Sequence, residues 1–141
     1  RTFSKIYGMA GLRAGASLAR PDLQQQIRKF SQTMMPITGM AGASASLQVK
    51  DLVATRRKIV AGVRADTFSF LDKHNFRFVK SVSNCFMLDV KRDPREVTRA
   101  LQREKVYVGR TWPSWPTHLR VTVGTADEMA KFQAALLKVM A

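Results

Sequence analysis

The chain has 141 residues, and its 24 Lys and Arg against 10 Asp and Glu give a formal net charge of +14 at pH 7. Its single cysteine, Cys85, excludes an internal disulfide, and no stretch approaches the roughly 20 apolar residues that cross a bilayer. The basic residues are scattered and accompany no zinc-ligand spacing, helix-turn-helix signature or RNA-reading aromatic motif, so we expect a solvated basic face rather than a nucleic-acid partner.

The first fifteen residues combine an amine, a hydroxyl and a guanidinium with three glycines, Gly8, Gly11 and Gly15. Glycines allow positive φ or a close approach of the backbone to a ligand. Ser4 and Arg13 can donate to phosphate oxygens, while Lys5 is left for covalent chemistry, such as a Schiff base with the carbonyl of pyridoxal phosphate. No Gly-Lys-Ser/Thr follows the glycines, which excludes a P-loop, and their spacing does not fit a dinucleotide fingerprint. Solvated side chains on an ordinary glycine-rich loop are the alternative.

The next part of the chain is predicted to be mainly helical. Residues 16–19 favour a short strand, and Pro21 at a first helical position predicts a helix to about Thr33. Residues 34–39 contain Pro36 and interrupt it. From about Met40 to His74 apolar residues recur at three- and four-residue spacing, which predicts one long amphipathic helix with a domain boundary inside residues 56–66.

The last part alternates strand and helix patterns, typical of a small α+β lobe. Asp93 followed by Pro94 predicts a capped helix start, and Thr125 with Glu128 predicts a capping box for the last helix. Strands are expected at residues 76–79, 85–90, 106–108 and 119–123.

Two motifs, in this order, resemble a known family. The run Thr2-Phe3-Ser4-Lys5-Ile6-Tyr7-Gly8-Met9-Ala10-Gly11-Leu12-Arg13-Ala14-Gly15 resembles the pyridoxal-phosphate lysine segment of the class I/II aminotransferases, most closely the histidinol-phosphate aminotransferase-like proteins. The run Leu119-Arg120-Val121-Thr122-Val123-Gly124-Thr125 resembles their carboxylate-binding strand. The resemblance implies an α/β architecture, a fragment of a fold-type I pyridoxal-phosphate-dependent transferase. Residues 1–60 would be the C-terminal part of a large cofactor-binding domain, and residues 61–141 would form a small α+β domain. A long helix would connect the two domains.

The resemblance assigns roles to individual residues. Lys5 would be the Schiff-base lysine, Ser4 and Arg13 would hold the phosphate of pyridoxal 5'-phosphate, and Arg120 would bind the substrate's α-carboxylate. Arg110 matches an arginine that helps bind the substrate's far end. From alternation alone, Arg120 points away from the face of its apolar neighbours, which also suits a solvated strand arginine.

The function implied is transfer of an amino group between an amino acid and a 2-oxo acid in amino-acid biosynthesis. The short loop after Arg110 carries Trp112 and Trp115, so histidinol phosphate and an aromatic amino acid both remain possible substrates. The resemblance implies a homodimer, and we expect a cytoplasmic protein with no metal and no membrane segment. Because the chain opens with Arg1 on the lysine motif, we expect a fragment that is inactive alone. The alternatives are a pyridoxal-phosphate-dependent amino-acid-phosphate decarboxylase on the same fold and a non-catalytic basic module that binds nucleic acid.

Overall fold

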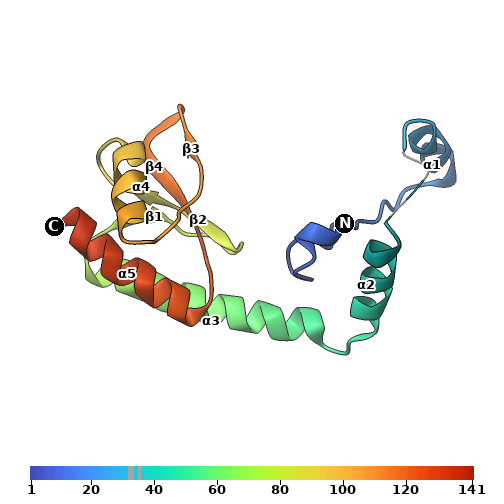
Figure 1. The fold of residues 1–141 in the computed structure, drawn as a ribbon, viewed down its shortest axis with the longest axis horizontal. Coiled ribbons are helices and arrows are strands. Elements are labelled where there is room, and N and C mark those ends of the chain that lie inside the picture. Colours follow the sequence, from blue (N-terminus) through green and yellow to red (C-terminus); the bar gives the residue numbers. More distant parts are fainter. Residues whose placement is uncertain (32–33, 35) are drawn as a thin grey trace. The chain divides into compact units, whose positions relative to one another are not determined.

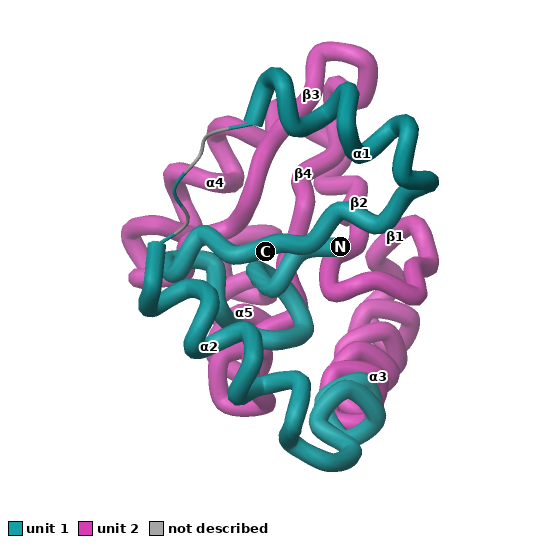
Figure 2. The backbone as a smooth tube through the Cα atoms, turned by 90° about the vertical axis from the view of Figure 1, so that its right-hand side faces the viewer, with its two compact units in different colours: residues 1–57 teal, residues 58–141 magenta. Residues whose placement is uncertain are grey.

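A computed structural model describes residues 1–31, 34 and 36–141. The chain divides into two compact units, residues 1–57 and residues 58–141, which Figure 2 shows in teal and magenta. In the described ranges, none of the helices combines the length and the apolar character that crossing a bilayer requires.

The first unit is built from short helices and one closed loop (Figure 1). It contains a 3₁₀ helix η1 (Ala10–Leu12), α1 (Pro21–Arg28), α2 (Ile37–Gln48) and the start of α3 (Leu52–Lys73). An isolated antiparallel bridge between Thr2 and Gly15 closes the loop that carries η1. In the described part of this unit, two apolar side chains are buried, those of Phe3 and Ala14.

The second unit contains the rest of α3 and a four-stranded antiparallel sheet in the order β1-β2-β4-β3 (Figure 1). Its elements are β1 (Arg77–Val79), β2 (Cys85–Asp89), α4 (Pro94–Arg103), β3 (Thr111–Trp112), β4 (Trp115–Thr122) and α5 (Ala126–Met140). In β2, Phe86 and Leu88 are buried while their neighbours are only partly buried, the alternation that one covered sheet face produces. Helix α4 contacts both α5 and β4.

The apolar core belongs to the second unit. Its fully or nearly fully buried side chains come from α3, β2, α4, β4, α5 and the segments beside them: Leu71, Phe86, Leu88, Val90, Val97, Leu101, Leu119, Val121, Val123, Met129, Phe132, Ala135 and Leu136. A core of this kind supplies most of the favourable free energy of folding.

Both predicted helix caps of this unit are confirmed. The Asp93 carboxylate accepts a hydrogen bond from the Arg95 N–H at 2.9 Å, at the start of α4. At the start of α5, Thr125 Oγ1 accepts from the Glu128 N–H at 3.3 Å, and Glu128 Oε2 accepts from the Thr125 N–H at 2.7 Å. This reciprocal pair is the capping box expected from the sequence.

Two helix predictions are wrong in extent. The single helix expected from Met40 to His74 is two helices, because the chain leaves α2 after Gln48 and Asp51 takes a left-handed φ of 57°. An aspartate tolerates that conformation better than most residues do. Helix α1 ends at Arg28, where 3₁₀-type bonds tighten its last turn; the predicted end at Thr33 lies outside the described residues.

Two predicted strands are not formed. Residues 16–19 form no strand, although Ala16 exchanges backbone hydrogen bonds with Arg1 at 2.8 and 2.6 Å, and residues 106–108 form no strand either. The Val106 N–H instead donates to the Leu101 carbonyl at 2.9 Å, at the end of α4, so this amide is unavailable to a sheet. The strand β3 begins later, at Thr111, and strand β4 begins at Trp115 rather than at Leu119.

Candidate active site

The lysine segment forms a closed loop held by its own backbone. The Phe3 N–H donates to the Ala14 carbonyl at 3.2 Å, and the Met9 N–H donates to the Phe3 carbonyl at 3.0 Å. The buried side chains of Phe3 and Ala14 anchor the two sides of the loop. The centroids of the Phe3 and Tyr7 rings lie 4.7 Å apart. The loop therefore carries Ser4, Lys5 and Arg13 between fixed ends.

The three side chains predicted to hold a cofactor retain hydrogen-bonding capacity. Lys5 is exposed, and its amine makes no hydrogen bond or ion pair to the residues that the structure describes. Ser4 is half-buried, and its backbone N–H donates to Thr2 Oγ1 at 3.0 Å. Arg13 has a φ of 54° and donates one guanidinium N–H to the Ala10 carbonyl at 2.9 Å, which leaves four of its five N–H groups.

Two residues that the sequence analysis did not single out support this loop. The guanidinium of Arg56, at the start of α3, donates to the Ile6 carbonyl at 3.0 Å, directly after Lys5. Gly39 in α2 lies so close to the loop that a Cβ there would approach the Leu12 carbonyl oxygen to 2.6 Å. Such close approach requires glycine. The sequence feature that could have indicated this close contact is the pair of glycines at positions 39 and 42 within an apolar helix.

The predicted substrate residues Arg110 and Arg120 are neighbours across the β3–β4 edge. The Arg120 N–H donates to the Arg110 carbonyl at 3.0 Å, and the Gly109 N–H donates to the Arg120 carbonyl at 2.8 Å. Leu119 and Val121 are buried, whereas Arg120 is half-buried, so its side chain leaves the sheet on the other face, as the alternation predicts.

The Arg120 side chain has an uncommon environment. Its Nε atom is buried and has no hydrogen-bond partner in the described part of the chain. The Cζ atom lies 5.8 Å from the centroid of the Trp112 ring, within the range of a cation–π contact. Arg110 lines a hollow of about 320 Å³ together with Arg95 and Arg99 of α4, and Arg120 is not among the residues that line it.

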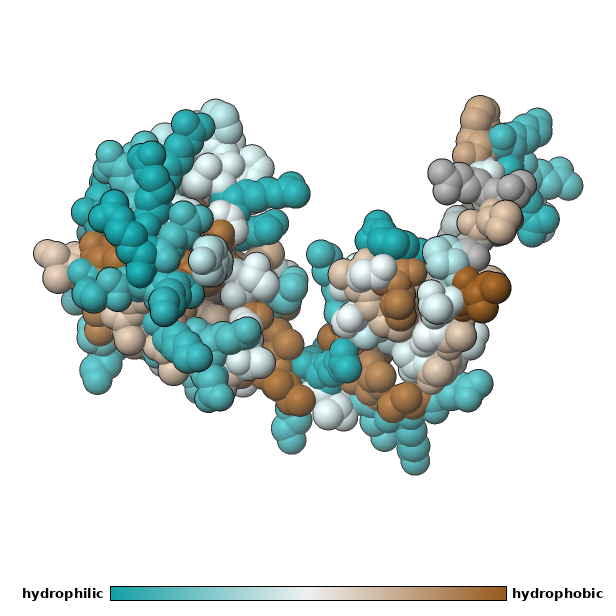
Figure 3. Space-filling view, viewed as in Figure 1, coloured by the Kyte–Doolittle hydropathy of each residue, from teal (hydrophilic) through white to brown (hydrophobic). Residues whose placement is uncertain are grey.

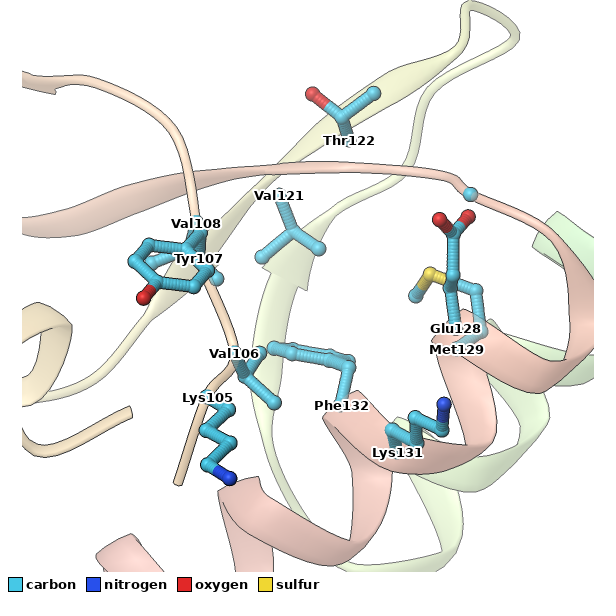
Figure 4. A pocket seen from close by; sticks show the side chains of 11 residues that line it. Lys105, Val106, Tyr107, Val108, Val121, Thr122, Glu128, Met129, Lys131 and Phe132 are labelled. Atoms are coloured by element: carbon cyan, nitrogen blue, oxygen red, sulfur yellow. The ribbon is translucent and has the colours of Figure 1, made fainter. Parts of the chain in front are cut away.

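A larger pocket in the second unit includes none of the predicted site residues. Its volume is about 360 Å³, and Figure 4 shows Val106, Val121 and Phe132 around it, with Lys105 and Lys131 nearby. The residues 106–108 that were expected to form a strand line this pocket as irregular chain.

Two carboxyl groups of the second unit have displaced pKa values. Partial burial would raise the pKa of Asp89, but hydrogen bonds from the Lys91 N–H and the Thr117 hydroxyl and the charges of His118 and Arg77 outweigh it and lower the pKa. The hydrogen bonds within the capping box lower the pKa of Glu128. Both groups stabilise turns or helix ends, and neither belongs to the predicted site.

The predicted residues thus form two sets. Ser4, Lys5 and Arg13 share one loop of the first unit, and Arg110 and Arg120 share one sheet edge of the second. The first set has the chemistry to bind a phosphorylated carbonyl compound, and the second can bind anionic groups.

The fold and these motifs agree with the family comparison: residues 1–136 match the model of aminotransferase class I and II, and the chain belongs to this family. Among its relatives is a histidinol-phosphate aminotransferase of Moorella thermoacetica, 32% identical over 100% of this chain and 37% of that protein. Histidinol-phosphate aminotransferase 2 of Methylococcus capsulatus is 38% identical over 99% of this chain and 38% of its own length. The chain therefore spans about two-fifths of the length of these relatives.

A solved structure has the same fold. The histidinol-phosphate aminotransferase from Sinorhizobium meliloti, determined in complex with pyridoxal-5'-phosphate, superposes with a TM-score of 0.84 at 25% sequence identity. The match covers 99% of this chain and 40% of that one. The fold-type I architecture predicted from the two motifs is confirmed.

Proposed function

We propose that this chain carries the cofactor lysine and the carboxylate-binding arginine of a pyridoxal-phosphate-dependent aminotransferase. The observation that carries the proposal is the closed loop on which an amine, a hydroxyl and a guanidinium occur together, at Lys5, Ser4 and Arg13. The amine has no partner among the described residues. This donor set fits pyridoxal phosphate, since an amine reacts with its carbonyl and the other two groups donate to its phosphate. The cofactor named for the Sinorhizobium meliloti relative supports the choice.

Each residue then has a definite task. Lys5 would hold the cofactor through its amine and, once released from it, would act as the base that moves the proton at the substrate Cα. Ser4 and Arg13 would hold the phosphate of the cofactor. Arg120 would bind the carboxylate of the 2-oxo acid, or of an amino-acid substrate, through parallel N–H donors. When bound, pyridoxal phosphate supplies the electron sink that stabilises the negative charge developing at Cα.

The substrates proposed are an amino compound and a 2-oxo acid. Histidinol phosphate is the first candidate because relatives of this chain are named for it, and Arg110 would bind the end of the substrate remote from the amine. An aromatic amino acid is the second, because Trp112 and Trp115 lie next in the chain. We assign residues 1–60 to a large cofactor-binding domain and residues 61–141 to a small domain, within a homodimeric enzyme.

We infer that the 141-residue chain alone does not turn over substrate. The chain spans about two-fifths of the length of its relatives. Lys5 and Arg13 are exposed in it, so a cofactor bound to them would stay open to water, whereas enzymes exclude water from the reacting groups. Mixing the purified chain with pyridoxal phosphate, an amino donor and a 2-oxo acid should yield no product above the cofactor-only background. Turnover at the median enzyme rate of about 10 s⁻¹ would contradict this inference.

The direct test of the cofactor site is chemical labelling. The chain is incubated with pyridoxal phosphate, reduced with borohydride and mapped by peptide mass spectrometry. We expect the reduced adduct on Lys5, its loss in Lys5→Ala, and its retention in Lys50→Ala, a control that removes another exposed lysine of the same unit. An adduct distributed equally over the exposed lysines would remove the basis of the proposed function.

A further inference from the structure

The guanidinium of Arg56 lies against the short turn that begins at Lys5. Its Nη1 atom donates to the Ile6 carbonyl at 3.0 Å, across 50 positions of the sequence. The same atom lies 3.0 Å from the point that a Cβ of Gly8 would occupy. Arg56 therefore meets the turn on both sides of Tyr7, and no step of the proposed reaction uses it.

The Ile6 carbonyl has no other partner in the described part of the chain. The turn is closed by the Gly8 N–H, which donates to the Lys5 carbonyl at 2.8 Å, and no backbone N–H donates to the carbonyl of Ile6. Backbone carbonyls in folded proteins are paired by protein groups or by water. Arg56 supplies that partner with a charged donor, which binds a carbonyl more strongly than a neutral one does.

Gly8 makes room for this contact. Its φ is 70°, a conformation that residues with a Cβ rarely adopt. An alanine at this position would be strained, and its Cβ would press on Arg56 Nη1. Because the arginine side chain is flexible, it would move away from the Ile6 carbonyl. The glycine thus permits both the turn and the hydrogen bond that holds it.

We propose that Arg56 is a positioning residue for Lys5. By holding the peptide group that directly follows Lys5 and Ile6, it restrains the turn and keeps the Lys5 amine on the same ordered loop as Ser4 and Arg13. A phosphate bound by the latter two residues then lies near the amine that reacts with the carbonyl of the same molecule. This inference rests on the proposed function, because it takes Lys5 as the cofactor lysine.

The first experiment needs no cofactor. In the ¹⁵N-labelled 141-residue chain, NMR measures the solvent exchange of the Gly8 and Met9 amides, whose N–H groups are held within the loop. Arg56→Ala should speed both about three- to tenfold, the effect of losing one solvent-exposed hydrogen bond. Arg56→Lys keeps a charged donor and should restore most of the protection. Arg57→Ala removes the adjacent exposed arginine and is the matched control.

A glycine variant tests the same contact from the other side. Gly8→Ala should also speed exchange of the Met9 amide, whereas Gly11→Ala should not, because nothing lies within 4 Å of a Cβ at position 11 of the same loop. Unchanged amide resonances of β2 would verify that the second unit is folded in every variant. Equal exchange rates in Arg56→Ala and Arg57→Ala would overturn the role of Arg56.

The second experiment measures the consequence for Lys5. After treatment with pyridoxal phosphate and borohydride, peptide mapping gives the ratio of adduct on Lys5 to adduct on Lys50, another exposed lysine. We expect this ratio to fall about three- to tenfold in Arg56→Ala and to stay unchanged in Arg57→Ala. Because both lysines are compared within one sample, differences in cofactor concentration do not affect the ratio.

The outcomes separate the inference from the function on which it rests. If the wild-type chain is labelled selectively on Lys5 and Arg56→Ala is labelled with the same selectivity, the positioning role is wrong and the proposed function stands. If the wild-type chain shows no preference for Lys5, the proposed function fails and the positioning role fails with it. Selective labelling that is lost in Arg56→Ala and kept in Arg57→Ala supports both.

Discussion

At the scale of single residues, the difference between arginine and lysine decides what position 120 can bind. Arg120→Lys keeps the positive charge but loses the planar fork. We expect acetate affinity to fall about tenfold, which corresponds to the loss of one charge-assisted hydrogen bond. NMR titration at constant ionic strength measures it, with Arg103→Lys, an exposed arginine of α4, as control. Equal affinity of Arg120→Lys and the wild-type chain would contradict a two-donor site.

Asp89 gives a residue-scale prediction for pH dependence. Its pKa is lower in the folded chain than in a free aspartate. As the pH falls, the Asp89 carboxylate is therefore protonated at a higher pH in the unfolded chain than in the folded chain. Stability from Asp89 is therefore present above the unfolded pKa, about 4, and is lost as pH falls through the lower folded pKa. Urea unfolding between pH 6 and pH 3 should show the advantage of wild type over Asp89→Asn shrinking on acidification. A difference that stays constant with pH would disprove this.

At the scale of secondary-structure elements, the N-terminus of α5 depends on one hydroxyl. Thr125→Ala removes the acceptor for the Glu128 N–H and should lower the free energy of unfolding of the second unit by about 1 kcal/mol. Thr125→Ser keeps the hydroxyl and should cost much less. Urea denaturation followed by circular dichroism compares the two variants, and equal losses would show that the hydroxyl is not responsible.

The packing of α4 onto the sheet is a second element-scale prediction. Leu101 is fully buried, and Leu101→Ala should destabilise the second unit by about 2–5 kcal/mol, since it removes buried methyl groups and leaves a cavity. Leu137→Ala provides the control, because that side chain is 38% exposed and its truncation loses less burial. The same denaturation measurement applies, and similar losses for both leucines would contradict the assigned core.

At the scale of the whole molecule, the two units differ in how much apolar surface they bury. In the first, Phe3 and Ala14 are the buried apolar side chains of the described residues, whereas Phe30 and Leu18 are 90% and 81% exposed. Figure 3 shows hydrophobic side chains on the surface of this part of the chain. The second unit holds the apolar core, so the stabilising burial is unevenly distributed.

This asymmetry predicts unequal protection from hydrogen exchange. Helices with few buried contacts open at low free energy, so the amides of α1 and α2 should exchange at least tenfold faster, on the order of 1.4 kcal/mol, than those of β2 and β4. Hydrogen–deuterium exchange followed by mass spectrometry measures both units in one sample. Similar protection in α2 and β4 would show that the first unit has stabilising contacts beyond those described.

The sequence by itself determined the features that depend on near neighbours. The caps at Asp93 and Thr125 were predicted correctly because the residues that make them lie within three positions of each other. The orientation of Arg120 followed from the two-residue period of a strand. The family also followed from sequence, because its two motifs are contiguous runs of residues.

The tertiary structure decided where distant segments meet. No proline or glycine marks the break at Asp51, so the apolar spacing of α2 and α3 was read as one helix. Residues 106–108 have strand-like side chains, but the end of α4 takes the Val106 N–H. Likewise, the contacts of Gly109 and Trp112 with Arg120 depend on how β3 and β4 pair. Local pattern carries no information on such contacts, since they form only when the whole unit packs.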